Sequence, residues 1–532
     1  MPTTRVPRLA ETGDQMKILI VTGKLAAETV REQTKGLKHE IDVISLPVTV
    51  AAFITPAYAA KQLVNMELAE YDMILLPGSV NGDVSPVEKA TGITTYKGTL
   101  HASDLPFVLS MNIDFSKTVP ASLLVKDALV KQAENEVLNV EKNWKDILAS
   151  HGGMVIGGKL PVSNGLPMRV LAEIVNAPTL SMDAIRSRAL YYKSQGADLI
   201  DIGMLASNPK PEAIPKIIDT IREAVDLPVS IDTLNVEEIK SSINAGIDLV
   251  LSLDEGNLDE IAPHIYDEAV VILPTNMKEG YLPKSAEERV TLLSKIIDNV
   301  QNLGIHNIIG DMVVEPLLNP GLLEGLKAYD MFHKQHPETL LLFGIGNAVE
   351  LIDADSPGVI AVLSALAREA GSNMLHIPEY SVKAKGSVRN ALRASHMMFL
   401  SEKRGTVLKD LGMDLLYLKE KRWIEHEYSL EENTVDVLQG IGETVYRPDK
   451  TGWFNIHVDR DENKIVAVFY PVGSKEPSTV IKGDDARVVY QTIIREKFIT
   501  NLDHAAYLGK ELEKAAIALK LGRSYVQDEP LF

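Results

Sequence analysis

Residues 168–203 read MRVLAEIVNAPTLSMDAIRSRALYYKSQGADLIDIG, and this stretch decides the fold. The apolar run Arg169–Val175 predicts a buried strand that ends at Asn176. Ser181 suits the N-cap of the following helix, whose first turn holds an acidic residue. The helix is expected to end at Gly196, because a C-terminal cap in the left-handed conformation favours glycine. The order strand, loop, helix is typical of one unit of a parallel α/β fold.

A second strand, Ala197–Ile202, completes the unit and carries Asp201 near its end. Asn176 and Asp201 are therefore polar residues at the C-terminal ends of neighbouring strands. Open α/β sheets and (β/α)8 barrels bind their ligands at these ends. We expect the functional site on this side of the fold.

The same unit is repeated along the chain. Eight strands are predicted: Arg169–Val175, Ala197–Ile202, Val229–Ile231, Leu249–Leu253, Val270–Leu273, Ile308–Gly310, Leu340–Phe343 and Met374–Ile377. Helical segments separate them, among them Ala213–Ala224, Val236–Ala245, Glu287–Leu303 and Val359–Ala370. Eight such units over about 210 residues predict an α/β fold with a central (β/α)8 TIM barrel.

Two smaller domains are expected to flank a barrel of residues 151–404. Residues 16–150 predict a doubly wound, Rossmann- or flavodoxin-like domain with strands at Lys17–Thr22, Ile41–Leu46, Met73–Leu76 and Phe107–Met111. Residues 151–167 read as a linker or as a hairpin below the barrel. Residues 405–532 predict a small α+β domain, with a hairpin of Trp453–Val458 and Lys464–Tyr470 followed by a helix at Asp503–Leu521. Residues 1–15 are expected to form a disordered tail.

The composition limits the classes of function. The formal net charge of −19 opposes binding to nucleic acid and to anionic membranes. The chain has no cysteine, which excludes disulfides, cysteine nucleophiles and thiolate metal sites and is compatible with a cytoplasmic protein. No apolar run is long enough for a transmembrane helix, and the N-terminus has no signal-peptide pattern. No metal-ligand set stands out in the sequence.

Carboxylate and amide side chains follow most of the barrel strands. The residues selected on this basis as substrate-binding are Asp201, Asp232, Asp254, Asn276, His376, Lys383 and Lys385. Carboxylates can accept paired N–H bonds from a guanidine-like edge, such as that of a pterin ring. Each residue taken singly can instead cap a helix or hold a loop. Their common position at strand ends favours a ligand rich in N–H donors.

The segment from Asn176 through GADLIDIG to LPVSIDT resembles the opening of dihydropteroate synthases. The three-part chain resembles in particular the archaeal dihydropteroate synthase-related proteins of the pterin-binding barrel superfamily. The resemblance implies that Asp232 and Asp311 hold a pterin, that Asn176 lies near the reactive edge, and that Asp201 supports them.

Three departures from that family concern the predicted chemistry. Gly346-Asn347 replaces an S-R-K sequence, Met374-Leu375-His376 replaces Arg-x-His, and Leu251-Ser252 replaces I-N-D. A site that expels diphosphate needs cations or a metal such as Mg²⁺ to take up the charge. The lysine of S-R-K and the arginine of Arg-x-His are absent here, which argues against a condensation that releases diphosphate. Lys383 and Lys385 are candidate substitutes for them.

The same positions resemble pterin-dependent methyltransferases of corrinoid systems. GIGN, which ends at Asn347, resembles their turn after the seventh strand, and Asp311–Pro316 resembles their run at the sixth. The resemblance implies catalytic functions for Asn347, Asp311 and Asn176. The segment Asp503–Asp528 also resembles the ends of archaeal thymidylate synthases and a corrinoid-carrying methyltransferase subunit.

Three functions remain open from the sequence. The first is a pterin-dependent, methyltransferase-like enzyme of one-carbon metabolism that acts on a reduced, tetrahydromethanopterin-like pterin, with a corrinoid protein as a candidate partner. The second is the condensation of a hydroxymethyl-dihydropterin diphosphate with an arylamine in methanopterin biosynthesis. The third is a non-catalytic pterin-binding or scaffold protein. Related barrels often dimerise, so a homodimer is a further expectation.

Overall fold

The computed structural model describes residues 15–111, 113–421, 438–440, 442 and 449–532. The tail predicted at residues 1–15 lies outside them, apart from Gln15. The chain divides into two compact units, Met1–Leu418 and Lys419–Phe532. The first unit holds both an N-terminal sheet and the barrel, so the predicted boundaries of three domains stay a prediction.

The N-terminal part of the first unit is a four-stranded parallel sheet with the order β2-β1-β3-β4. Its strands are β1 (Lys17–Thr22), β2 (Glu40–Ser45), β3 (Met73–Leu76) and β4 (Thr95–Lys97). Its helices are α1 (Ala27–Thr34), α2 (Pro56–Leu63), α3 (Ser85–Thr91), α4 (Leu105–Ser110) and α5 (Ala121–Leu124). Buried apolar clusters lie on both faces of the sheet, as expected for a doubly wound domain.

The strand predicted at Phe107–Met111 is wrong, because most of this segment belongs to helix α4. Pro106 stands in the first turn, where proline favours a helix. The buried residues Leu105, Val108 and Leu109 follow helical spacing instead of alternation. The fourth strand is the three-residue β4, which is too short to give a clear pattern in the sequence.

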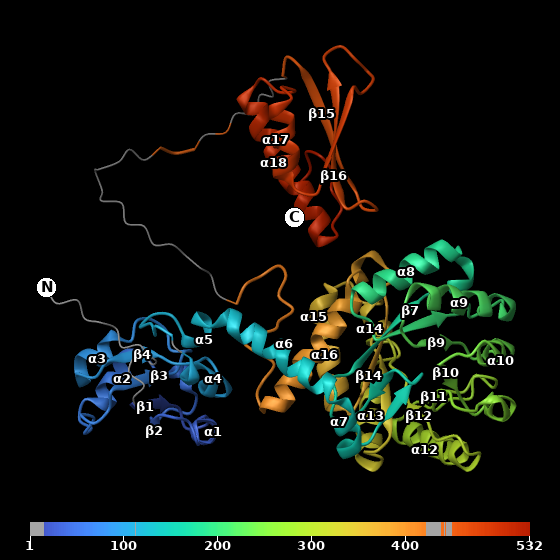
Figure 1. Cartoon of the computed structure of the whole chain (residues 1–532), viewed down its shortest axis with the longest axis horizontal. Helices are drawn as coiled ribbons and strands as arrows, with labels where there is room; N and C mark the ends of the chain where they lie inside the picture. Colours follow the sequence, from blue (N-terminus) through green and yellow to red (C-terminus); the bar gives the residue numbers. More distant parts are fainter. Residues whose placement is uncertain (1–14, 112, 422–437, 441, 443–448) are drawn as a thin grey trace. The chain divides into compact units, whose positions relative to one another are not determined.

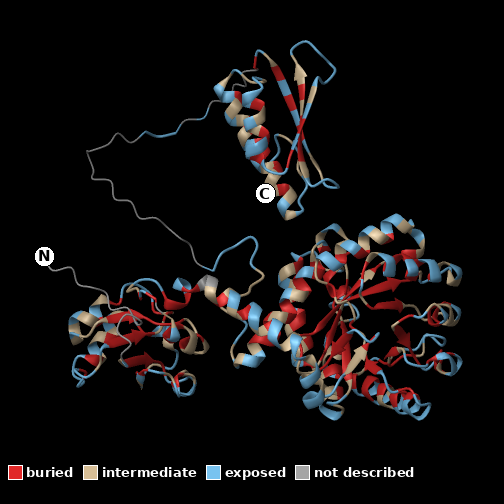
Figure 2. Ribbon diagram, viewed as in Figure 1, coloured by how far each residue is buried: buried red, intermediate tan, exposed pale blue. Residues whose placement is uncertain are grey.

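The barrel confirms the predicted (β/α)8 fold. Eight parallel strands close on themselves, because β14 pairs with β7. They are β7 (Arg169–Ile174), β8 (Leu199–Gly203), β9 (Val229–Asp232), β10 (Leu249–Leu253), β11 (Ala269–Ile272), β12 (Ile308–Gly310), β13 (Leu340–Gly344) and β14 (Met374–Pro378). Figure 2 shows these strands buried inside a layer of helices.

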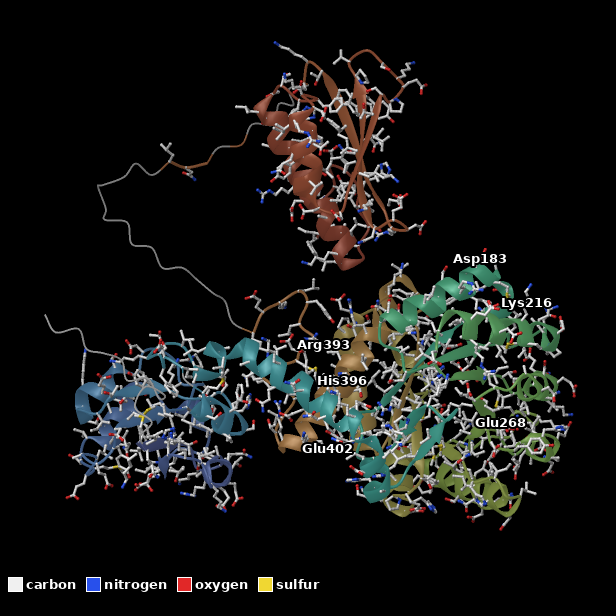
Figure 3. All side chains as sticks on the ribbon, viewed as in Figure 1. Asp183, Lys216, Glu268, Arg393, His396 and Glu402 are labelled. Carbon is white, nitrogen blue, oxygen red and sulfur yellow. The ribbon has the colours of Figure 1, made fainter. Side chains whose placement is uncertain are left out.

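The helices surround the strands, as Figure 1 shows. They are α8 (Met182–Ser194), α9 (Ile214–Ala224), α10 (Val236–Asn244), α11 (Leu258–Ile261), α12 (Ala286–Asn302), α13 (Leu323–Gln335), α14 (Gly346–Val349), α15 (Ser356–Glu369) and α16 (Ser387–Arg404). Their outer faces carry charged side chains such as Asp183 of α8 and Lys216 of α9 (Figure 3). Arg368 of α15 donates a hydrogen bond to Glu402 of α16, so the two neighbouring helices are also joined on their exposed side.

The opening unit folds as its sequence indicates. The Ser181 hydroxyl accepts a hydrogen bond from the Ala184 amide at the start of α8. Gly196 has a φ of +87°, the left-handed conformation that follows the helix. Strands β7 and β8 then lie in register, with Glu173 opposite Asp201.

A short antiparallel hairpin closes the N-terminal end of the barrel. It consists of β5 (Met154–Ile156) and β6 (Leu160–Val162), so of the two alternatives predicted for residues 151–167, a linker or a hairpin, the structure shows the hairpin. Ile156, Leu160 and Val162 pack with Leu171, Leu199 and other inward residues of the strands. The lower interior of the barrel is therefore a filled apolar core.

Two helices precede this hairpin and attach to the barrel. They are α6 (Lys126–Lys142) and α7 (Trp144–His151). Arg169 of β7, whose side chain is 5% exposed, donates two hydrogen bonds to the carboxylate of Glu141 on α6, at 2.6 and 2.9 Å. Such a bidentate pair fixes orientation as well as distance.

The second unit is a three-stranded antiparallel sheet packed against two helices, which confirms the predicted hairpin. Its strands are β15 (Gly452–Asp459), β16 (Lys464–Pro471) and β17 (Thr479–Gly483), and its helices are α17 (Ala486–Arg495) and α18 (Leu502–Leu521). Strand β17 and helix α17 add to what the sequence predicts. No helix among the described residues is both long and apolar enough to cross a membrane.

Candidate pterin site at the barrel mouth

The inside of the barrel changes from apolar to polar toward the C-terminal ends of the strands. Side chains two residues apart on a strand point to the same side. Leu171 of β7 belongs to the apolar floor, and Glu173 lies on the same face one step closer to the mouth. Leu199 and Asp201 have this relation on β8, as do Met374 and His376 on β14.

Glu173, Asp201 and His376 meet above this floor. The His376 Nε2 atom lies 3.1 Å from Asp201 Oδ2 and 3.8 Å from Glu173 Oε2. Asp201 is fully buried, and its other oxygen accepts a hydrogen bond of 2.5 Å from the Ser230 hydroxyl. The sequence predicted Asp201 and His376 for the site but missed Glu173, which the alternation along β7 places on the inward face.

The electrostatics of this cluster are unusual. Burial alone lowers the pKa of His376, but the hydrogen bond and charge of Asp201, with the charges of Glu173 and Asp232, raise it to about 10. This direction favours the protonated imidazole. Burial raises the pKa of Glu173 to about 7, against the opposite effect of His376. Strongly shifted pKa values at a cleft are typical of functional sites.

Asp232 and Asp311 each have one oxygen that no donor among the described residues reaches. Oδ1 of Asp232 accepts from the Ser252 hydroxyl at 2.8 Å. Oδ1 of Asp311 accepts from the Tyr329 hydroxyl at 2.6 Å and the Val313 amide at 2.7 Å. Burial raises the pKa of both carboxyl groups. Asp232 is the last residue of β9 and Asp311 follows β12, so both lie at C-terminal strand ends, where a free oxygen can accept from N–H groups of a ligand.

The two predicted asparagines come from different loops. Asn176, after β7, is half-buried and adopts the left-handed conformation with a φ of +52°. Asn347 lies in α14, directly after β13. It is exposed and donates a hydrogen bond from Nδ2 to the Val314 carbonyl at 2.8 Å. This bond joins the β13 loop to the β12 loop, which also carries Asp311. The side-chain oxygen of Asn347 accepts no hydrogen bond from a described residue.

Two other predicted residues are used by the loops themselves. Oδ1 of Asp254 accepts from the amides of Gly256 and Asn257, and Oδ2 accepts from the Thr275 hydroxyl and the Met277 amide. These bonds use both oxygens, so Asp254 joins the β10 loop to the β11 loop. Asn276 accepts from the Glu279 amide at 3.3 Å and supports the tight turn of the latter loop.

The two predicted lysines do not converge on the cluster. Lys383 donates to the Ile352 carbonyl at 2.5 Å and to Asp353 at 3.1 Å, both in the loop after β13. Lys385 is exposed and has no polar partner among the described residues.

A carboxylate occupies the N-terminus of α16. Glu379, which is 4% exposed, accepts from the amides of Gly386 and Val388 at 3.0 and 2.9 Å and from the Tyr191 hydroxyl at 2.9 Å. The start of the helix after the eighth strand is a common phosphate-binding place in TIM barrels. In this chain Glu379 satisfies those amides, and the sequence did not single it out.

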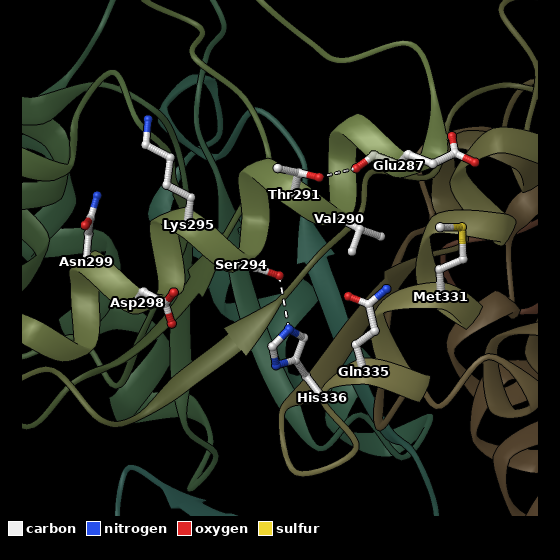
Figure 4. A pocket seen from close by; sticks show the side chains of 10 residues that line it. All are labelled: Glu287, Val290, Thr291, Ser294, Lys295, Asp298, Asn299, Met331, Gln335 and His336. Carbon is white, nitrogen blue, oxygen red and sulfur yellow. Dashed lines mark hydrogen bonds between the residues drawn. The ribbon is translucent and has the colours of Figure 1, made fainter.

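A separate groove of about 620 Å³ lies outside the barrel, between α12 and α13 (Figure 4). Within it the Ser294 hydroxyl lies 3.1 Å from Nε2 of His336. It is lined by Glu287, Val290, Thr291, Ser294, Lys295, Asp298, Asn299, Met331, Gln335 and His336. None of these is a predicted site residue.

The closed eight-stranded parallel barrel is consistent with a TIM barrel of the pterin-binding type. Residues 175–326 match the family model of the pterin binding enzymes. Residues 16–99 match a family of unknown function, DUF6513, and residues 448–528 match the family PterinBD-DUF4346.

The chain belongs to the family of the uncharacterized protein MJ0107 of Methanocaldococcus jannaschii. The two sequences are 38% identical over 531 residues, which cover 97% of this chain and 99% of that protein. A Ycf91-like protein of a Nostoc species is 38% identical over 74 residues, 13% of this chain and 58% of that protein.

Similar solved structures include two dihydropteroate synthases. A Yersinia pestis structure with a pterine–sulfa conjugate is 16% identical, has a TM-score of 0.38, and covers 47% of this chain and 99% of that one. The Xanthomonas albilineans enzyme in complex with 7,8-dihydropteroate is 18% identical, has a TM-score of 0.35, and covers 43% and 90% of the two chains.

Proposed function

We propose that the barrel binds a reduced pterin of the tetrahydromethanopterin type and transfers a methyl group from it in one-carbon metabolism. The free oxygens of Asp232 and Asp311 suit the N–H donors of the pterin's guanidine-like edge. Asp201 and His376 belong to β8 and β14 and Asn176 follows β7, three neighbouring strands beside β9, so they are candidates to face the reactive edge.

The Glu379 carboxylate at the N-terminus of α16 is the observation that favours methyl transfer over condensation. A condensing enzyme must stabilise a departing diphosphate, which needs cationic or N–H groups at the mouth. Here Glu379 already accepts from the amides of Gly386 and Val388, and Lys383 is engaged with Ile352 and Asp353. Lys385 has no polar partner among the described residues, but it is exposed and does not converge on the cluster. Methyl transfer releases no phosphate and needs no such pocket.

The reaction needs a proton at N5 of the pterin. An acceptor nucleophile attacks the methyl carbon, the C–N bond breaks, and N5 keeps the electron pair and gains a proton. A general acid near N5 makes the amine a better leaving group. The positively charged His376, next to Asp201, is the described group at the mouth that can supply this proton through water. A corrinoid protein is the acceptor that we favour.

Pterin titration of three variants tests the site. Asp311→Asn and Asp232→Asn are expected to weaken the binding of 5-methyl-tetrahydromethanopterin about tenfold or more, since a hydrogen bond to a charged group contributes roughly 1.5–3 kcal/mol. Asn347→Ala is expected to slow methyl transfer more than it weakens binding. Asp298→Asn, in the groove outside the barrel, is the matched control and should bind as the wild type does.

Three outcomes would refute the proposal in different ways. Release of diphosphate from a hydroxymethyl-dihydropterin diphosphate in the presence of an arylamine would show condensation. Tight pterin binding without methyl transfer to any acceptor would show a carrier. Wild-type affinity in both aspartate variants would place the pterin elsewhere.

A further inference from the structure

Glu173, Asp201 and His376 form a compact set of metal-ligating side chains. One ligand atom from each lies within 4.8 Å of the others, and the three come from the adjacent strands β7, β8 and β14. Metal ions bind such oxygen and nitrogen atoms at about 2.0–2.2 Å. Atoms bound to one ion at these distances lie roughly 3–4 Å apart, which the separations of 3.1 and 3.8 Å satisfy.

An ion pair between His376 and Asp201 accounts for only part of this arrangement. Glu173 is 15% exposed, and its carboxylate has no hydrogen-bond donor among the described residues. It forms an ion pair with His376 Nε2 at 3.8 Å, and that nitrogen lies closer to Asp201, at 3.1 Å. A largely buried carboxylate without a donor is costly, and a metal ion in place of the His376 proton would give Glu173 and Asp201 a shared cation.

The backbone beside Glu173 makes room for this carboxylate. A Cβ atom at Gly203 would overlap Oε1 of Glu173. Gly203 does not have a positive φ, so its backbone conformation does not require glycine. The absence of a side chain at Gly203 therefore keeps the Glu173 carboxylate within the cluster.

Neighbouring groups orient the cluster and add negative charge. The Ser230 hydroxyl holds Oδ1 of Asp201 and leaves Oδ2 directed to His376. Hydrogen bonds of this kind to ligating carboxylates are typical of metal sites. Asp232 adds a third carboxylate nearby, so a single imidazole faces three acidic groups.

We propose that Glu173, Asp201 and His376 bind a divalent transition-metal ion, of the Zn²⁺ or Mn²⁺ class, at the floor of the mouth. A set of two carboxylates and one imidazole suits these ions better than thiolate-preferring ones. Three protein ligands leave at least one coordination position open for water or for a substrate atom. Metal binding at Nε2 requires that nitrogen without its proton, so the metal-loaded cluster is an alternative to the protonated His376 of the proposed methyl transfer.

The experiment titrates metal into the full-length protein after treatment with a chelator, without pterin. We expect the protein to bind one equivalent of Zn²⁺ in calorimetry. Co²⁺ in the same site should give visible absorption bands typical of an ion with a low coordination number. His376→Gln and Glu173→Gln are each expected to lower the affinity at least tenfold. Gly203→Ala should lower it as well, although it removes no ligand, because it displaces Glu173.

His336→Gln is the matched control, since His336 also lies near a carboxylate, 3.8 Å from Glu338, but on the outer surface. Circular dichroism shows whether each variant is folded. Because Glu173 is not fully buried, Glu173→Gln keeps the test valid even if another variant fails to fold. A full-length protein without a Zn²⁺ equivalent, or unchanged affinity in folded Glu173→Gln and His376→Gln, would overturn the site. Since no pterin is present, this titration measures the metal site alone, and the pterin-binding and methyl-transfer assays test the proposed function separately.

Discussion

Replacement of Arg289 by methionine should destabilise the barrel and weaken pterin binding together. Arg289 lies on α12 and is 1% exposed. Its guanidinium donates to the carbonyls of Pro283, Met312 and Val313 at 3.0–3.2 Å and to Glu315 at 2.5 Å. These bonds hold the loop after β12, in which Val313 has a φ of +67° and donates its amide to Asp311.

The magnitude follows from the groups that the substitution leaves behind. Methionine fills a similar volume but leaves the Glu315 carboxylate, 13% exposed, without its partner. Removal of one member of a buried ion pair costs about 3–5 kcal/mol. Arg289→Met should therefore lower the urea midpoint of barrel unfolding, followed by circular dichroism, and raise the Kd for the pterin because Asp311 loses its support.

Arg289→Lys separates the two contributions, because lysine keeps the charge near Glu315 but cannot reach three carbonyls at once. It should lie between the wild type and Arg289→Met in both measurements. A urea midpoint and a pterin Kd that both match the wild type in Arg289→Met would refute the reasoning.

Three further predictions concern single groups. Burial lowers the pKa of His396 on α16 (Figure 3) to about 4, so folding favours the neutral imidazole. The stability that this group contributes is present above pH 6.5 and is lost as the pH falls toward 4, by up to about 3 kcal/mol. His396→Gln should make the melting temperature depend less on pH in this range, and an unchanged dependence would contradict the prediction. Five hydrogen bonds from Thr451, Thr500 and Asn501 outweigh burial and hold the pKa of Asp449 well below its usual range. Its stabilisation is present above about pH 3.9 and is lost below it, so Asp449→Asn should cost roughly 2 kcal/mol at pH 7, and its melting temperature should approach that of the wild type at pH 2. Glu379→Ala should cost about 1 kcal/mol and make the protein sensitive to phosphate, which would raise the melting temperature of the variant but not of the wild type; equal responses would show that the α16 amides take no anion.

The barrel could be predicted because parallel strands buried on both faces are nearly continuous apolar runs. Leu249–Leu253 matches β10, and Met374–Ile377 differs from β14 by one residue. Short edge strands have no such pattern, and β4 at Thr95–Lys97 was missed for this reason. The apolar segment near Phe107 then passed for the fourth strand.

The site was less predictable because spacing does not show what a polar side chain contacts. Asp232 and Asp254 look alike in sequence, yet one keeps an oxygen free and the other uses both oxygens within its loops. Glu173 was not predicted because it precedes the end of its strand, where Asn176 is the polar residue. Because side chains two residues apart on a strand face the same side, the apolar inward residue Leu171 indicates that Glu173 also faces inward.

The β5–β6 hairpin makes the barrel a cup with one opening. Because Ile156, Leu160 and Val162 fill the lower end, nothing can enter or leave through it. In the proposed methyl transfer both reactants would use the same entrance, and we expect the one that binds deeper to arrive first and to depart last. Initial-rate kinetics with both reactants varied would then show an ordered pattern.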